Sequence, residues 1–252
     1  MTTKIALITG GSRGLGRSMA MHLADRGVDS VVTYRSAKER AAEVVAEVES
    51  RGGRAVALPL DVTAIASFDS FTSGLKGALK EVWGRESFDY LVNNGGTGAH
   101  ATFVETSEET FDYLMNVHLK GPFFLTQKLV PLIADEGRVV NISSGLTRFS
   151  FPGYAAYASM KGGVEVLSRY MAKELGARRI TVNTLAPGAI ETDFGGGAVR
   201  DNPDLNRMIA SQTAMGRVGL PDDIGGAVAS LLTGDNGWVT GQRIEVSGGQ
   251  GL

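Results

Sequence analysis

The chain has 252 residues, of which 43% are hydrophobic and 21% charged, a composition typical of a soluble globular protein. Its net charge of -2 and the lack of a long basic run give no reason to expect nucleic acid or a membrane surface as a partner. A small molecule is therefore the expected partner. The chain has no cysteine, its three histidines lack metal-ligand spacing, and its glycine-rich start interrupts any signal-peptide apolar region, so we expect a cytoplasmic protein without a metal site.

Short runs rich in β-branched residues alternate with longer amphipathic stretches along the whole chain. The runs predict seven strands, at 5–9, 31–34, 55–60, 90–94, 138–143, 180–186 and 243–247. Helix starts are expected from capping-box spacing at Ser36 with Glu39 and Thr106 with Glu109, and helix ends at Gly27, Gly52, Gly84 and Gly176.

This alternation predicts an α/β fold with a doubly wound, mostly parallel seven-stranded sheet that helices cover on both faces, a Rossmann fold. No linker of low complexity divides the chain, so residues 1–252 are expected to form a single dinucleotide-binding and catalytic domain. The least regular segment, 188–217, contains GGG at 195–197 and predicts a mobile substrate lid with short helices.

The first predicted strand leads directly into TGGSRGLG at 9–16, followed by an amphipathic helix. Glycines let the backbone approach a pyrophosphate, and the helix N-terminus favours its negative charge. The spacing of Gly10, Gly14 and Gly16 differs from the GxGxxG fingerprint, and flavodoxin-like proteins also place such turns after strands. Dinucleotide binding is therefore predicted by this turn but not proved by it.

The residues after the second predicted strand indicate which dinucleotide is bound. Where an NAD site has an acidic residue, this chain has Tyr34, Arg35 and Ser36, and Arg13 lies within the glycine turn. Two guanidinium groups near one ribose suit a 2′-phosphate, although each arginine alone is also compatible with a solvated surface position. Their joint position favours NADP(H).

The stretch YAAYASMK at 154–161 places two tyrosines before a lysine. In a helix Tyr157 and Lys161 lie one turn apart on the same face, whereas Tyr154 lies about 10 Å along the axis from the lysine. Only Tyr157 is expected to contact Lys161. Taken alone, the octapeptide also fits an aromatic helix face with a surface lysine.

These motifs together resemble the short-chain dehydrogenase/reductase family, in its single-domain "classical" branch of NADPH-dependent ketoreductases and 3-oxoacyl-acyl-carrier-protein reductases. The matching motifs are TGGSRGLG, Asp61 in LPLDVT, NNGG at 93–96, Ser144 ahead of Tyr157 and Lys161, and PGAIET at 187–192. The resemblance spans nearly the whole chain. It implies cofactor contacts from Gly10, Ser12, Arg13, Gly14, Leu15, Gly16, Tyr34, Arg35, Ser36, Asp61, Val62, Asn93, Gly95, Pro187, Gly188, Ile190 and Thr192.

The resemblance also implies a catalytic role for three side chains. Tyr157 would donate a proton to a substrate carbonyl oxygen, with Lys161 and the oxidised nicotinamide lowering its pKa. Ser144, thirteen residues before Tyr157, would hydrogen-bond the same oxygen. Ser143 is the competing serine at the end of the same strand.

One position departs from the family pattern, because His118 stands where an asparagine is expected. Asn116 is a poor substitute, since two residues on an α-helix turn about 200°. In the family the asparagine's main-chain carbonyl holds a water, and Pro122, which has no N–H, is expected to leave the His118 carbonyl free. The imidazole is predicted either to titrate beside this proton relay or to be tolerated by packing.

The sequence therefore predicts an NADPH-dependent oxidoreductase that reduces a ketone or aldehyde to an alcohol. A 3-oxoacyl-thioester reductase is the alternative enzyme, and a non-catalytic NADP-sensing protein is the alternative of another class. Thr97, Phe149, Tyr154 and Phe194 are expected to line an apolar or aromatic substrate pocket. By resemblance, the chain is expected to form a homotetramer.

Overall fold

A computed structural model describes residues 3–252, and within this range seven strands form one parallel sheet. The strands lie in the order β3-β2-β1-β4-β5-β6-β7. Their bounds are β1 Lys4–Ile8, β2 Val28–Tyr34, β3 Ala55–Pro59, β4 Phe88–Asn93, β5 Ile133–Ile142, β6 Thr181–Pro187 and β7 Arg243–Val246. The predicted doubly wound fold is confirmed, and every strand pair is parallel.

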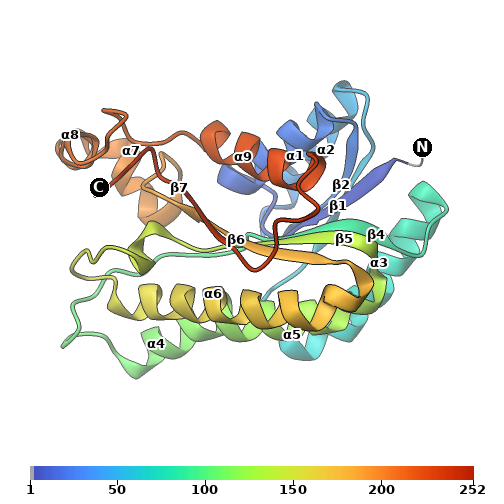
Figure 1. The fold of residues 1–252 in the computed structure, drawn as a ribbon, viewed down its shortest axis with the longest axis horizontal. Coiled ribbons are helices and arrows are strands. Elements are labelled where there is room, and N and C mark those ends of the chain that lie inside the picture. The colour runs from blue at the N-terminus through green and yellow to red at the C-terminus, as the bar shows by residue number, and fades with distance from the viewer. Residues whose placement is uncertain (1–2) are drawn as a thin grey trace.

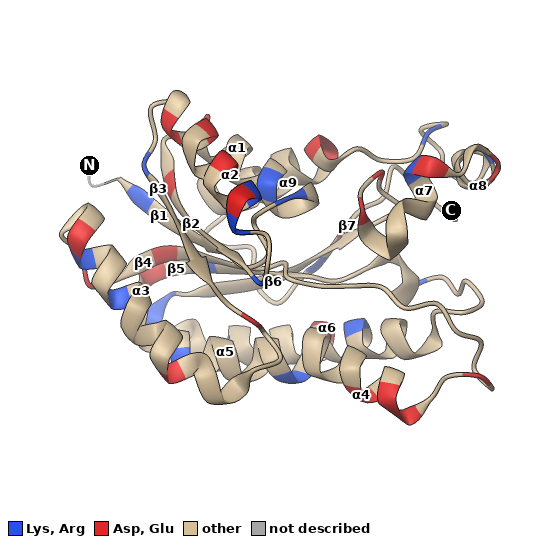
Figure 2. Ribbon diagram, turned by 180° about the vertical axis from the view of Figure 1, so that it is seen from behind, with Lys and Arg blue, Asp and Glu red and all other residues tan. Residues whose placement is uncertain are grey.

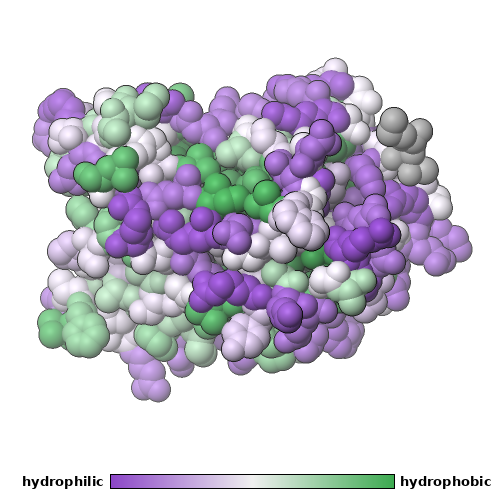
Figure 3. Space-filling view, in the orientation of Figure 1, coloured by the Kyte–Doolittle hydropathy of each residue, from purple (hydrophilic) through white to green (hydrophobic). Residues whose placement is uncertain are grey.

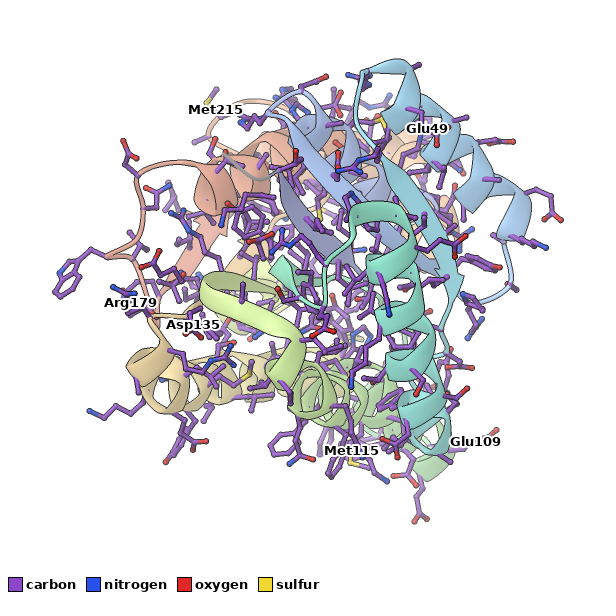
Figure 4. The ribbon with its side chains drawn as sticks, turned by 90° about the vertical axis from the view of Figure 1, so that its right-hand side faces the viewer. Glu49, Glu109, Met115, Asp135, Arg179 and Met215 are labelled. Carbon is purple, nitrogen blue, oxygen red and sulfur yellow. The ribbon has the colours of Figure 1, made fainter. Side chains whose placement is uncertain are left out.

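Two layers of helices cover the sheet (Figure 1). The upper layer in that view contains α1 Gly14–Ala24, α2 Lys38–Ser50 and α9 Pro221–Thr233. The lower layer contains α3 Phe68–Trp83, α4 Glu108–Met115, α5 Gly121–Leu129 and α6 Ala155–Leu175. The same sandwich is visible from its end in Figure 4.

Each helix layer buries its own hydrophobic core against the sheet. Side chains of Ile8 and Val92 pack with α1 and α9 on one face, while Leu7 and Leu91 pack with α3 and α5 on the other. Successive residues of a strand point to opposite faces, so a strand covered on both faces must be apolar throughout. The uninterrupted runs IALI and YLV in the central strands follow from this requirement.

Two predicted helix starts are wrong in detail. The N-cap of α2 is Ala37, with no side-chain capping bond, rather than Ser36. α4 is capped by Ser107, one residue after Thr106, because the Ser107 hydroxyl accepts a hydrogen bond from the Thr110 N–H at 3.1 Å. Both segments offer adjacent candidate start positions, so capping-box spacing alone did not distinguish between them.

The predicted lid segment, 188–217, lies beyond the carboxyl ends of the strands and carries two short helices, α7 Ala198–Asp201 and α8 Pro203–Ser211 (Figure 1). Gly195, Gly196 and Gly197 all have positive φ, a conformation that residues with a Cβ rarely adopt. Among the helices of residues 3–252, none has the combination of length and apolarity that crossing a bilayer requires.

Candidate active site

A cavity of about 580 Å³ lies at the carboxyl ends of the strands, between β1 and β4. After β1 the chain continues to one half of the sheet, and after β4 it continues to the other half. Open α/β sheets bind ligands at this kind of switch point. The lining of the cavity includes predicted cofactor residues from the ends of five strands and the loops that follow them: Gly10, Ser12, Arg13, Gly14, Leu15, Tyr34, Arg35, Ser36, Asp61, Val62, Gly95, Pro187, Gly188, Ile190 and Thr192. Ser144, Tyr157, Lys161, His118 and the four predicted pocket residues also line it.

Two predicted cofactor residues lie outside the cavity lining. Asn93 is buried beneath it, where its amide donates to Thr126 Oγ1 at 2.9 Å and to Asn141 Oδ1 at 2.7 Å. Gly16 has a packing role, because a Cβ there would lie 2.4 Å from the Gly10 carbonyl oxygen. The adjacent Asn94, which was not predicted, lines the cavity instead.

The glycine turn forms a backbone cradle at one side of the cavity. Asn94 donates to the carbonyl oxygens of Thr9 and Gly10, which fixes the turn, and a Cβ on Gly10 would lie 2.9 Å from the Cα of Gly95. Helix α1 begins at this turn, and its N-cap, Arg13, makes no side-chain capping bond. The first N–H groups of α1 therefore suit a phosphate, and the residues present fit a dinucleotide.

Asp61 and Arg35 lie at the opposite end of the cradle. Asp61 Oδ1 accepts hydrogen bonds from the N–H of Thr63 at 2.9 Å and from its hydroxyl at 2.7 Å. Burial alone would raise the pKa of Asp61, but these bonds and the Arg35 charge lower it, so the carboxylate is ionised. An ionised carboxylate here could accept a hydrogen bond from the cofactor, and Asp61 is one of the predicted cofactor contacts.

Tyr157, Lys161 and Ser144 meet at the inner end of the cavity. Helix α6 carries the first two, and Ser144 follows the end of β5, close enough to Tyr157 to influence its pKa. Lys161 Nζ lies 5.7 Å from the centre of the Tyr157 ring and donates to the Ile142 carbonyl oxygen at 2.7 Å. The tyrosine and lysine are thus on one face of the helix, as their spacing predicts.

In the protein alone the Lys161 charge does not lower the pKa of Tyr157, and the predicted effect of the oxidised nicotinamide stays a prediction. Burial raises the pKa of Tyr157 above its usual value, the hydrogen bond with Ser144 opposes this effect, and Tyr154 adds to it. Burial also lowers the pKa of Lys161 from 10.5 to about 8. Desolvation disfavours both charged forms, which outweighs the attraction expected between phenolate and ammonium. Tyr157 is consequently a protonated phenol at neutral pH, the form that a general acid requires.

The two competing serines have different partners. Ser143 is buried, and its hydroxyl donates to Glu165 Oε1 at 2.6 Å. Glu165 also accepts from Arg243 Nε at 2.9 Å, so the Ser143 hydroxyl is held in a structural network, although Ser143 also lines the cavity. Ser144 lines the cavity next to Tyr157.

His118 is buried beside the catalytic tyrosine. Its ring makes an edge-to-face contact with Tyr157 at 5.0 Å between centroids, and its Nε2 lies 2.6 Å from the Thr97 carbonyl oxygen. A carbonyl only accepts, so Nε2 carries the proton, and the buried Nδ1 has no hydrogen-bond partner among the described residues. Burial, reinforced by the Lys161 charge, holds the pKa of His118 well below its usual value. The imidazole is therefore neutral at neutral pH, which favours the packing alternative over the titrating one.

The backbone around His118 also differs from the prediction. Residues Asn116–Lys120 form a π-helical turn, in which the Gly121 N–H donates to the Asn116 carbonyl. Pro122 would free the His118 carbonyl only if the hydrogen bonds here were α-helical, so the free carbonyl stays a prediction. Single π-helical turns within helices are frequently found at functional sites.

Aromatic rings form the outer wall of the cavity. Phe194 lies 5.7 Å from Tyr157 between ring centroids, and Tyr154 lies 6.5 Å from Tyr157 and 6.2 Å from Phe151. Phe149 lines the same space. The predicted apolar and aromatic character of this pocket agrees with its lining.

Sequence reasoning missed several lining residues. Asn94 is the second residue of the NNGG motif, next to the predicted Asn93, so the motif already indicated this position. Gln250, near the C-terminus, accepts from the Ala189 N–H at 2.8 Å, and only the tertiary structure brings it there. Gly98 lines the substrate side, where its missing Cβ leaves space for the Phe194 ring.

Comparison with known proteins agrees with this geometry. A family model described as "Enoyl-(Acyl carrier protein) reductase" matches residues 10–250. The crystal structure of the angucycline C-6 ketoreductase LanV with bound NADP is 38% identical, with a TM-score of 0.94, and the match covers 100% of this chain and 96% of LanV.

Two curated relatives are similar over almost their whole length. The hydroxynaphthalene reductase-like protein Arp2 of Metarhizium brunneum is 36% identical, over 98% of this chain and 94% of Arp2. The 3-oxoacyl-[acyl-carrier-protein] reductase FabG of Staphylococcus aureus is 37% identical, over 98% of each chain. The chain therefore belongs to the short-chain dehydrogenase/reductase family of oxidoreductases.

Proposed function

We propose that this enzyme reduces a ketone on a fused aromatic ring system to an alcohol, with NADPH as the reductant. One observation carries the proposal: the hydroxyl-bearing side chains of Ser144 and Tyr157 line one cavity, and the outer wall of this cavity is aromatic. Planar ring systems stack favourably on such walls. LanV and Arp2, whose names refer to angucycline and hydroxynaphthalene chemistry, support this substrate class.

The predicted NADP(H) cofactor is confirmed, because LanV, similar over the whole of this chain, was solved with NADP bound. The fit of the glycine cradle agrees with this cofactor. The hydride for the reduction comes from its nicotinamide ring.

The chain's own residues would supply the proton and fix the geometry. Tyr157 holds a proton on Oη and transfers it to the carbonyl oxygen as hydride reaches the carbonyl carbon, which converts C=O into CH–OH. Ser144 Oγ donates a hydrogen bond to the same oxygen and stabilises its developing charge. Lys161, held by the Ile142 carbonyl, presents its remaining N–H donors beside Tyr157 and favours the phenolate that forms.

His118 acts in this proposal as a positioning residue. Its Nε2–H holds the Thr97 carbonyl and so fixes the loop that follows β4, which is one wall of the pocket. Its ring edge also supports the Tyr157 ring from the side. Neither role requires a change of protonation state.

A 3-oxoacyl-thioester reductase is the second candidate, because FabG is 37% identical over nearly the whole chain. An acyl-carrier protein is acidic and would need free basic residues near the cavity. Arg148 and Lys128 are instead paired with Glu245 at 2.6 Å and with Asp69 at 2.7 Å. Arg169 of α6 is exposed and forms no ion pair with the described residues, so the basic residues do not separate the two candidates, and the aromatic wall is what favours the ring ketone.

A substrate panel separates these functions. Oxidation of NADPH would be followed at 340 nm with 1-tetralone as a fused-ring ketone, cyclohexanone as a ketone without an aromatic ring, and acetoacetyl-coenzyme A as a 3-oxoacyl thioester. The proposal predicts the highest kcat/KM for 1-tetralone, and a preference for the thioester would establish the second candidate. Binding of NADPH without turnover of any probe would favour the non-catalytic NADP-sensing alternative.

A further inference from the structure

Asp193, in the predicted lid segment, gathers three arginines from separate helices. Arg200 of α7 approaches its Oδ1 at 2.6 Å, while Arg13 and Arg40 both approach its Oδ2 at 3.4 Å. Arg13 is the N-cap of α1, and Arg40 lies in the first turn of α2. Acidic and basic residues lie close together around α7 (Figure 2).

The charges in this cluster are unevenly matched. Arg200 also forms a two-pronged pair with Asp201, at 2.7 Å and 2.8 Å, so its charge is well neutralised. Arg13 and Arg40 share one carboxylate oxygen at a distance near the limit of hydrogen bonding. A phosphate monoester, with three oxygens and a charge near -2, would satisfy these two arginines better than Asp193 does.

The residue after Asp193 covers the catalytic tyrosine. The Phe194 ring lies against Tyr157, and a Cβ on Gly98 would come within 2.8 Å of Phe194 Cε1, so the ring occupies the notch that this glycine leaves. Gly195, Gly196 and Gly197 follow, all with positive φ. A run of three residues without side chains gives the backbone little resistance to movement.

We propose that Asp193 and Phe194 form a clasp through which the 2′-phosphate of NADPH controls access to Tyr157. The phosphate binds Arg13 and Arg40, and their ion pairs with Asp193 break. The lid then turns about the three glycines. Phe194 moves away from Tyr157, and the substrate occupies the space that its ring held. NAD(H) has no 2′-phosphate and leaves the clasp closed. The substrate part of this inference rests on the proposed function, whereas the cofactor part does not.

Hydrogen–deuterium exchange of the lid amides tests the clasp without turnover. Exposed ion pairs are individually weak, so losing two of them is expected to speed exchange at residues 194–197 about fivefold. Saturating NADP⁺ should produce this change in the wild-type protein and saturating NAD⁺ should not. Asp193→Asn should exchange rapidly with either nucleotide or with none.

Calorimetric affinities give a second measurement. Asp193→Asn is expected to bind NADP⁺ about fivefold more tightly than the wild-type protein, with an unchanged Kd for NAD⁺. The matched control is Asp204→Asn, which removes an exposed acid of the same lid that pairs with Arg207 instead of the cluster. This control should behave as the wild type does.

Either of two results would overturn the clasp. One is an equal effect of NAD⁺ and NADP⁺ on exchange of the lid, and the other is weaker NADP⁺ binding by Asp193→Asn. Both measurements are independent of catalysis. If no ketone is reduced but NADP⁺ alone releases the lid, the proposed function fails and the clasp stands.

Discussion

At the scale of single residues, burial shapes the catalytic pair Tyr157 and Lys161. It raises the pKa of the phenol and lowers that of the lysine to about 8, so each group is pushed toward its neutral form. A neutral phenol is ready to donate, which suits reduction of a carbonyl. Lys161 close to its pKa can pass a proton on at little cost, which suits reprotonation of Tyr157.

The lowered pKa of Lys161 makes folding stability depend on pH. Its pKa is 10.5 in the unfolded chain and about 8 in the folded protein, so between these values the unfolded chain binds more protons. Stability must then rise with pH across this window. Relative to Lys161→Met, which lacks the group, the wild-type protein should gain roughly 1.4 kcal/mol per pH unit.

Urea unfolding of both proteins at intervals from pH 8 to 10 measures this difference. Tyr157 is present in both proteins, so its contribution to the pH dependence cancels in the difference between their free energies of unfolding. A stability difference that stays constant over the range would mean that Lys161 is not desolvated in the folded protein.

His118 is expected to influence binding more than proton transfer. Because its pKa lies well below the usual value, the pH profile of kcat between pH 6 and 8 should be the same in His118→Asn as in the wild type. His118→Ala loses the hydrogen bond to Thr97, and KM for the ketone should rise about tenfold as that wall loosens. An inflection near pH 6.5 that disappears in His118→Asn would restore the titrating role.

At the scale of elements, the strands were predictable and the details around the site were not. Seven β-branched runs gave all seven strands, because a parallel sheet buried on both faces requires continuous apolar sequence. β5 begins at Ile133, five residues before the prediction, since ADEG at 134–137 carries no strand signal. The π-helical turn at Asn116–Lys120 likewise has no recognisable sequence pattern.

The catalytic motif could be predicted from the sequence, whereas the contacts of the substrate wall could not. Tyr157 and Lys161 follow from a four-residue spacing within one helix. Gly98, Phe194 and Gln250 line the same cavity only because the tertiary fold brings them there. No local sequence pattern predicts that they line it.

The notch at Gly98 gives a prediction for the loop after β4. Gly98→Ala places a methyl group where the Phe194 ring lies, and a flat substrate that takes the place of Phe194 would meet the same group. KM for a fused-ring ketone should rise about tenfold, while KM for cyclohexanone and the Kd for NADPH should hardly change. Equal changes for both ketones would show that the notch does not receive the substrate.

At the scale of the whole molecule, hydrophobic residues interrupt the hydrophilic surface (Figure 3). The exposed hydrophobic residues of the described chain include five on α4, α5 and α6, with exposed fractions from 36% to 66%: Phe111, Phe123, Phe124, Val166 and Tyr170. Monomeric proteins rarely leave large contiguous apolar patches exposed. A second copy of this chain is the partner we expect on these helices, within the predicted homotetramer.

Light scattering coupled to size-exclusion chromatography tests this assembly. The wild-type protein should have four times the 26.5-kDa chain mass, and Val166→Asp should dissociate it to smaller species that still bind NADPH. The matched control, Val104→Asp, removes an exposed valine outside these helices and should leave the mass unchanged. A wild-type protein of 26.5 kDa would contradict the tetramer.

The central claim is that Tyr157 protonates a ketone held against the aromatic wall while NADPH is bound beside it. The most direct measurement is kcat/KM for NADPH-dependent reduction of 1-tetralone by the wild-type enzyme and by Tyr157→Phe, together with the Kd of each protein for NADPH. We expect a loss of about a thousandfold in kcat/KM with an unchanged Kd, because only the proton donor is removed. Retention of activity in Tyr157→Phe, with normal NADPH binding, would contradict it.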